Sequence, residues 1–133
     1  MTISTFDDLL QAARSQPDPQ RLLFVFAGVE LPDDASPAQR EGFEAGQGGA
    51  LVPLMCVDKR PDELGSFSAL VAESSQFGHD WRIVFAAAMS GSDRAPTSED
   101  AEKPLERMVE SIKRGEHSGF IPFDTQGHAV QIG

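Results

Sequence analysis

Residues 22–29 read LLFVFAGV, an apolar run with no polar side chain in it. A strand with one side facing water alternates apolar and polar residues, so this unbroken run indicates a strand buried on both faces. The runs ALVPLMCV at 50–57 and WRIVFAAAM at 81–89 have a similar character. The sequence therefore predicts three buried strands, which need other layers packed against them.

Helical segments alternate with these strands. The first is predicted over residues 4–15, with Ser4 or Thr5 as its N-cap and an apolar stripe at helical spacing. The others are predicted from Ser36 to near Gly46, from Pro61 to near Gly78, and from Thr97 to just before Gly115. Pro104 lies within the last of these and should kink it or mark its first turn at Lys103.

The remaining segments place the edges of the sheet. Pro53 has no N–H to give to a ladder, so the strand that holds it is an edge strand or contains a bulge. Residues 120–132 predict a terminal β-hairpin, with Gly127 in the left-handed conformation of its turn. The order α β α β α β α β β predicts one α/β domain over residues 1–133. Its open sheet would have about five strands, with the C-terminal hairpin at one edge.

The composition narrows the classes of partner. The chain has 133 residues, of which 21 are acidic and 11 basic, and its net charge is −10. That charge would repel nucleic acids and anionic membranes, so neither is predicted as a partner. No stretch approaches the ~18 apolar residues of a spanning helix, and the acidic start MTISTFDDLL is unlike a signal peptide. A single cysteine gives neither a disulfide framework nor a Cys-rich zinc site, and we expect the chain in the reducing cytoplasm.

Polar residues that follow the predicted strands give one candidate site. If the first three strands run parallel, the loops at their C-terminal ends share one side of the sheet, where open α/β sheets bind ligands. The candidate cleft residues are Asp58, Arg60, Ser92, Asp93 and Arg94. The acidic residues that follow the first strand would lie on the same side, namely Glu30, Asp33 and Asp34. The alternative is that these loops are polar only because loops face water.

The other candidate groups are isolated. Cys56 comes near the end of the second strand and is either a reactive thiol or a small buried hydrophobe. His79, His117 and His128 have no second ligand at metal-binding spacing, so no metal site is predicted. The glycine-rich turn 46–49 runs from a helix into a strand, which is the reverse of a phosphate loop. No cofactor is therefore predicted.

One helical segment carries a row of carboxylates. Glu99, Glu102, Glu106 and Glu110 follow one another at spacings of three, four and four residues in the last predicted helix. They could dock a basic partner, or they could form a solvated face, partly offset by pairs such as Glu99 with Lys103. The solvated face is the simpler interpretation, and the sequence leaves both open.

Several stretches resemble a family of small proteobacterial proteins over nearly the whole chain. The matching stretches are LLFVFAGVELPDD, FEAGQGGALVPLMCVDKRPDEL, FSALVAES, WRIVFAAAMSG and APTSEDAEKPLERMVESIKRG. Members of this family often carry the description "ribonucleotide reductase subunit alpha". A reductase of that kind needs a radical-bearing cysteine and a reducing cysteine pair in a much larger barrel, whereas this chain has only Cys56. The resemblance therefore implies no catalytic residue, and reductase activity is not expected. The strand–proline–strand region has a fainter likeness to bacterial proteins associated with enhanced serine sensitivity.

We therefore expect a non-catalytic protein-interaction or regulatory module. Its predicted contact surfaces are the sheet edge near Pro53 and the terminal hairpin 119–132, through which it would bind a protein partner or pair with itself as a homodimer. The alternative is a small enzyme or metabolite-binding protein that uses the polar cleft.

Overall fold

The computed structural model describes residues 3–31, 34–44, 50–76, 78, 80–91 and 93–130. Its helices are α1 (Phe6–Arg14), α2 (Pro37–Glu44), α3 (Phe67–Ser75) and α4 (Ser98–Lys113), with a 3-10 turn, η1, at Pro61–Glu63. Its strands are β1 (Gln20–Glu30), β2 (Ala50–Lys59), β3 (Ile83–Ser90) and β4 (Ile121–Phe123). Helices and strands therefore alternate as the sequence predicts, up to the terminal hairpin.

The strands form one open sheet in the order β2-β1-β3-β4, and each neighbouring pair is antiparallel. The predicted α/β fold with an open sheet is confirmed, with four strands rather than about five. The return arm of the hairpin makes single bridges, from Phe123 to Ala129 and from Thr5 to His128, and residues 131–133 lie outside the described part. The assumption that the first three strands run parallel is wrong, because β1 is antiparallel to both β2 and β3.

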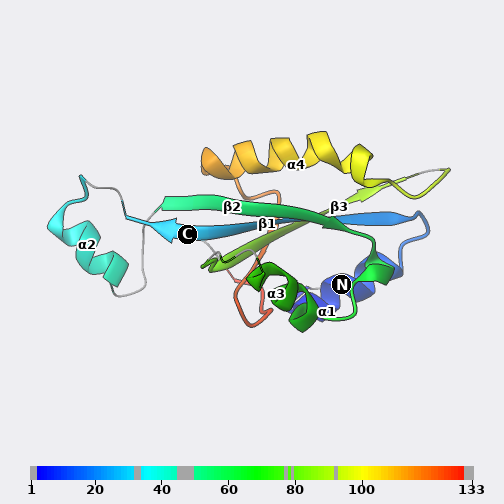
Figure 1. The fold of residues 1–133 in the computed structure, drawn as a ribbon, viewed down its shortest axis with the longest axis horizontal. Coiled ribbons are helices and arrows are strands. Elements are labelled where there is room, and N and C mark those ends of the chain that lie inside the picture. The colour runs from blue at the N-terminus through cyan, green and yellow to red at the C-terminus, as the bar shows by residue number, and fades with distance from the viewer. Residues whose placement is uncertain are drawn as a thin grey trace.

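Helices cover both faces of this sheet (Figure 1). α4 lies on one face, α1 and α3 lie on the other, and α2 projects beyond the end of β1. β1 is buried from Arg21 to Gly28. This confirms the predicted burial of the LLFVFAGV run except at its last residue, Val29, which is half-buried. Alternate side chains of β1 enter two cores, with Phe24 packed on the α1 side and Val25 on the α4 side.

α1 and α4 each begin at a threonine whose side chain accepts a hydrogen bond from a backbone N–H in the first turn of the helix. α1 begins after Thr5, whose hydroxyl accepts the backbone N–H of Asp8 at 3.3 Å, so Thr5 rather than Ser4 is the N-cap. α4 begins after Thr97, which caps it in the same way. Pro104 therefore lies inside α4, and the alternative first turn at Lys103 is wrong.

The third predicted helix is divided in two. The segment from Pro61 forms the single turn η1, and α3 begins only at Phe67. Ser66 caps this second helix, because its hydroxyl accepts the backbone N–H of Ala69 at 3.2 Å. The prediction of one helix from residue 61 to near residue 78 is therefore wrong, and Gly65-Ser66 is the signal for the break.

β2 is an outer strand of the sheet, and it also contains a bulge. Phe26 lies opposite Met55 whereas Ala27 lies opposite Pro53, which leaves Leu54 as an extra residue. Pro53 predicted an edge strand or a bulge, and both are present. At the other edge of the sheet, the left-handed conformation predicted for Gly127 is confirmed by its φ of 82°.

Candidate functional site

A partly buried ion pair ties β1, β2 and α4 together at one end of the sheet. Arg21, at the start of β1, is 8% exposed, and its Nε lies 2.6 Å from Oδ2 of Asp58 on β2. Arg21 also donates to the carbonyl of Pro96 at 3.1 Å and to Oγ of Ser98 at 2.6 Å. Ser98 in turn donates to Oδ2 of Asp58 at 2.6 Å. We call Arg21, Asp58, Pro96 and Ser98 the Arg21 cluster, because they provide one another's hydrogen-bond partners.

The Arg21 cluster keeps Asp58 ionised. Burial raises the pKa of this carboxyl, but hydrogen bonds from Ser98 and Arg21, together with the charge of Arg21, outweigh burial and hold the pKa below its ordinary value. Asp58 is therefore a carboxylate near neutral pH. It fastens the start of α4 to the end of β2, which is a structural task.

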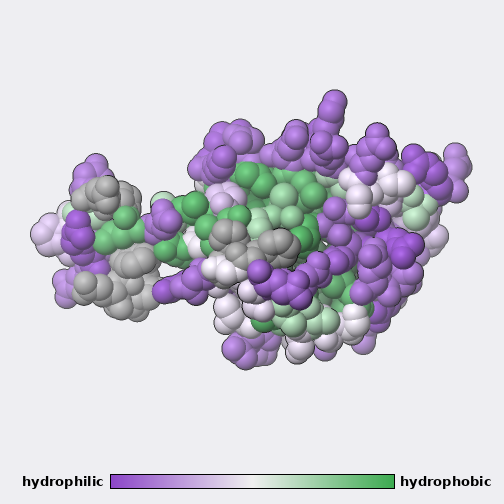
Figure 2. Space-filling view, viewed as in Figure 1, coloured by the Kyte–Doolittle hydropathy of each residue, from purple (hydrophilic) through white to green (hydrophobic). Residues whose placement is uncertain are grey.

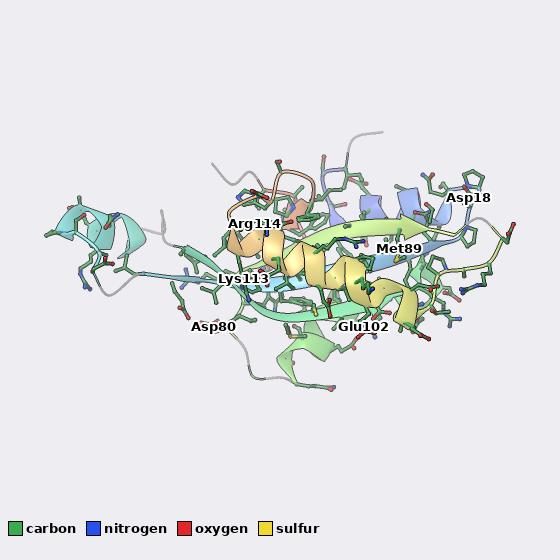
Figure 3. All side chains as sticks on the ribbon, turned by 90° about the horizontal axis from the view of Figure 1, so that it is seen from above. Asp18, Asp80, Met89, Glu102, Lys113 and Arg114 are labelled. Carbon is green, nitrogen blue, oxygen red and sulfur yellow. The ribbon has the colours of Figure 1, made fainter. Side chains whose placement is uncertain are left out.

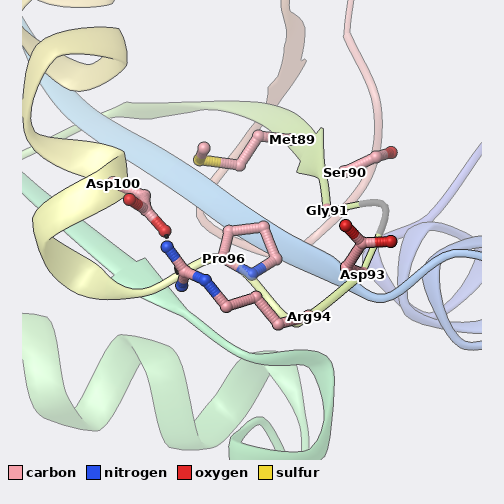
Figure 4. A pocket seen from close by; sticks show the side chains of 7 residues that line it. All are labelled: Met89, Ser90, Gly91, Asp93, Arg94, Pro96 and Asp100. Atoms are coloured by element: carbon pink, nitrogen blue, oxygen red, sulfur yellow. Dashed lines mark hydrogen bonds and ion pairs between the residues drawn. The ribbon is translucent and has the colours of Figure 1, made fainter.

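An open cleft lies in the connection from β3 to α4 (Figure 4). It has a volume of about 500 Å³ and is lined by Met89, Ser90, Gly91, Asp93, Arg94, Pro96 and Asp100. The exposed Arg94 side chain donates to Oδ2 of Asp100 at 3.2 Å. A Cβ at Gly91 would lie 1.9 Å from the carbonyl oxygen of Arg94, so this loop closes only with glycine there. The cleft is lined by one guanidinium and two carboxylates, which are groups that can hydrogen-bond a small polar molecule.

The structure divides the predicted cleft residues among separate places. Asp93 and Arg94 lie together in the cleft, whereas Asp58 belongs to the Arg21 cluster. Arg60 is exposed and pairs with Glu63 at 3.2 Å in the turn η1. The predicted cleft residue Ser92 lies outside the described residues.

The direction of β1 explains why its acidic residues do not join the cleft. Glu30 pairs with Ala50 at the start of β2, whereas Asp58 and the cleft lie near the ends of β2 and β3. The expectation that Glu30 and Asp34 share one side with Asp58 is therefore wrong. Asp33 lies outside the described residues.

A second depression lies between α4 and the outer edge of β2, and we call it the β2 groove. It has a volume of about 500 Å³ and is lined by Cys56, Glu102, Leu105, Glu106, Val109 and Glu110. In the space-filling view, apolar surface lies beneath a hydrophilic row that belongs to α4 (Figure 2). Seen from above, Glu102 lies on the β2 side of α4 and Met89 on the opposite side (Figure 3). The groove therefore combines an apolar floor with an acidic rim.

Cys56 is exposed in this groove, so its interpretation as a small buried hydrophobe is wrong. Burial of part of the thiol raises its pKa, and the nearby carboxylate of Asp58 raises the pKa further. The geometry thus gives an accessible thiol with little thiolate at neutral pH.

We expect Cys56 to react slowly with iodoacetamide at neutral pH because the thiolate is the reacting form. The rate should be lower than in the same chain unfolded in urea, and it should still rise steeply above about pH 8.5, the ordinary thiol value. Mass spectrometry of the alkylated chain across a pH series measures this rate. A rate that levels off below pH 8 would contradict the raised pKa.

The other isolated groups show no shared site. His117 lies beside the ring of Phe85, with 5.6 Å between ring centroids, and His128 is exposed near Asp124. His79 and the turn 46–49 lie outside the described residues. Among the residues that are described, no three His, Cys, Asp or Glu side chains are grouped to hold a metal ion. Within the same residues, no helix has the length and apolar character needed to cross a membrane.

Comparisons with models of known protein families, with curated proteins and with solved structures find no match to this chain. Its function is therefore inferred from its own geometry.

Proposed function

We propose that the chain is a non-catalytic protein-interaction module of the cytoplasm, which binds an extended partner segment at the outer edge of β2. The observation that carries the proposal is the sheet order: within the described residues, no strand pairs with the outer side of β2. An unpaired edge presents backbone N–H and C=O groups to another chain, and an added strand satisfies them. The cytoplasm follows from the sequence argument, which rests on the single cysteine.

The two halves of β2 differ in their readiness to pair. Pro53 lacks an N–H, and the bulge at Leu54 interrupts the ladder, so the first half of the edge is poorly suited to an added strand. From Met55 to Lys59 the register with β1 continues without a shift. We therefore place the partner segment along residues 55–59.

The opposite edge of the sheet is less available. β4 is followed by the return arm of the hairpin, in which Phe123 bridges to Ala129. The backbone N–H of Val130 also donates to the carbonyl of Pro122 at 3.0 Å. This arm occupies the outer side of β4, which favours β2 over the hairpin 119–132 as the contact surface.

The β2 groove would receive the side chains of the partner. A strand directs alternate side chains to opposite faces, so every second residue of an added strand would point toward α4. There it would meet Leu105 and Val109 beside Cys56. Backbone pairing and a side-chain groove together are what strand-addition sites use for affinity and specificity.

A peptide-display selection on the full chain tests this proposal. Random peptides of ten residues, the length of β2, are selected for binding. They are then titrated against protein alkylated at Cys56 with a fluorescein maleimide at alkaline pH. Because Cys56 lines the groove, the bulky label should abolish binding. The same reagent applied to the Cys56→Ser variant should leave Kd within about twofold of the untreated protein. The absence of selected peptides, or equal binding to the labelled protein, would overturn the proposal.

The cleft between β3 and α4 supports a second candidate, a small enzyme or metabolite-binding protein. Arg94 and the carboxylates of Asp93 and Asp100 surround a volume of about 500 Å³ there. A metabolite that raises the unfolding temperature of the wild type but not of an Arg94→Ala variant would assign the function to this cleft. Labelling of Cys56 should leave that effect unchanged, which separates the two candidates.

A further inference from the structure

We propose that the segment received by the β2 groove is cationic, with basic side chains at every second position. This inference rests on the proposed function and names the chemistry of the partner. It selects between the two interpretations of the α4 carboxylates that the sequence leaves open.

Three carboxylates form the rim of an apolar groove. Glu102, Glu106 and Glu110 are all exposed and all line the β2 groove, together with Leu105 and Val109 from the same helix. Among the described residues, the one ion pair that these three carboxylates make is the exposed pair of Glu110 with Lys113, at 3.5 Å. Such a pair on a helix surface contributes about 0.3–0.5 kcal/mol and exchanges readily for another cation. The rim is therefore open to basic side chains of a partner.

Arg107 of α4 lies on the flank of the helix that faces away from the acidic row. Arg107 lines a depression on the opposite flank of the helix, with Met108, Ala87 and Ala88. The basic side chain of Arg107 thus lies toward β3, while the acidic row lies toward β2. A basic residue, Lys113, lies beside one end of the row and pairs with Glu110. A row of carboxylates beside an apolar floor is complementary to a partner of opposite charge.

The spacing of the row fits an extended chain. Carboxylates four residues apart on a helix are separated by about 6 Å along its axis. Side chains on one face of a strand repeat every ~6.8 Å. α4 runs along β2 (Figure 1), so a strand added to β2 would bring every second residue to the acidic row. Over three positions the mismatch is about 1.5 Å, which the flexible stems of lysine and arginine can absorb.

A second copy of this chain fits the groove poorly. Antiparallel pairing of two β2 strands about a twofold axis normal to the sheet would place both α4 helices on one face. Their acidic rows would then approach each other across the junction, in a chain whose net charge is already −10. Like charges facing one another across an interface oppose association. The same row that attracts a basic segment therefore disfavours homodimer formation through β2.

A defined peptide and two matched triple variants test the inference. The probe is a fluorescein-labelled ten-residue peptide of alternating valine and lysine, the length of β2. Glu102→Gln/Glu106→Gln/Glu110→Gln removes the rim charges, whereas Asp18→Asn/Glu41→Gln/Glu116→Gln removes three exposed charges elsewhere. Glutamine is a good helix former, so the rim variant should fold, which its thermal unfolding verifies. Both variants change the net charge equally.

We expect the rim variant to raise the Kd of the probe about tenfold and the control variant to raise it less than about twofold. The loss should lie mainly in the association rate, and it should shrink as salt rises from about 50 to 300 mM. Equal weakening by both variants, or no binding of the probe to the wild type, would overturn the inference. Display-selected peptides that map to the groove without a positive charge would overturn it as well, while leaving the proposed function standing.

Discussion

Replacing Phe6 with alanine is expected to lower the free energy of unfolding by about 3–5 kcal/mol. Phe6 is 1% exposed and joins α1 to three other elements through aromatic contacts. Its ring centroid lies 5.6 Å from that of Phe24 on β1, 5.0 Å from that of Phe67 on α3 and 5.6 Å from that of Phe123 on β4. Truncation would leave a cavity that none of these anchored elements can easily close.

Urea unfolding followed by the fluorescence of Trp81 measures this loss. Trp81 is the single tryptophan, and its ring packs against Phe67 and Phe26 in the same core. The Phe6→Leu variant serves as the control, because it keeps most of the volume and should cost less than about 1.5 kcal/mol. If Phe6→Ala does not fold, the unfolding free energy of Phe6→Leu still measures how far the core depends on the ring of Phe6. A loss below about 1 kcal/mol for Phe6→Ala would mean that the core collapses around the site.

The burial of β1 could be predicted from the sequence, but the direction of the strands could not. The prediction of three buried strands is wrong for β2, which is an outer strand and is only half-buried along most of its length. The unbroken apolar run of β1 indicates burial on both faces, and helices do cover both faces. The intervening helix suggested a crossover between parallel strands, yet α2 lies beyond the end of the sheet and covers neither face. The connection from β1 to β2 is therefore a long hairpin that contains a helix. Burial depends on local composition, whereas direction depends on where the connecting segment packs.

The same reason limits what could be predicted about the site. The sequence marks Asp58 as a polar residue at a strand end, but it gives no sign of the partner Arg21. Arg21 follows Gln20 at the start of an apolar run. Two polar residues in this position are typical of a strand end that faces water. Only the register, in which Leu23 lies opposite Asp58, brings the two charges within reach. The acidic row of α4 was visible in the sequence, but the apolar groove beneath it depends on which strand α4 covers.

Replacing Arg21 with methionine is expected to lower the free energy of unfolding by about 2–3 kcal/mol near neutral pH, which is less than the ~3–5 kcal/mol of a fully buried pair because Asp58 is partly exposed. The variant leaves the carboxylate of Asp58, whose side chain is 18% exposed, without the guanidinium that compensates its burial. Arg60→Met is the matched control, because Arg60 is exposed and its ion pairs should contribute less than about 1 kcal/mol.

The pH dependence of this loss has a definite sign. In the wild type the pKa of Asp58 is lowered in the folded state, so its contribution is present above the unfolded pKa and disappears as pH falls through the folded one. Without Arg21, burial favours the protonated form of the Asp58 carboxyl. Lowering the pH therefore removes the cost of the unpaired carboxylate in the variant, while it removes the stabilising ion pair in the wild type. The difference in unfolding free energy should therefore be largest near pH 7 and should shrink below about pH 4. Urea titrations of both proteins across this range measure the difference. A loss that stays constant with pH would show that Arg21 acts through packing of its stem, and the Arg21→Met/Asp58→Leu double variant would then fail to recover stability.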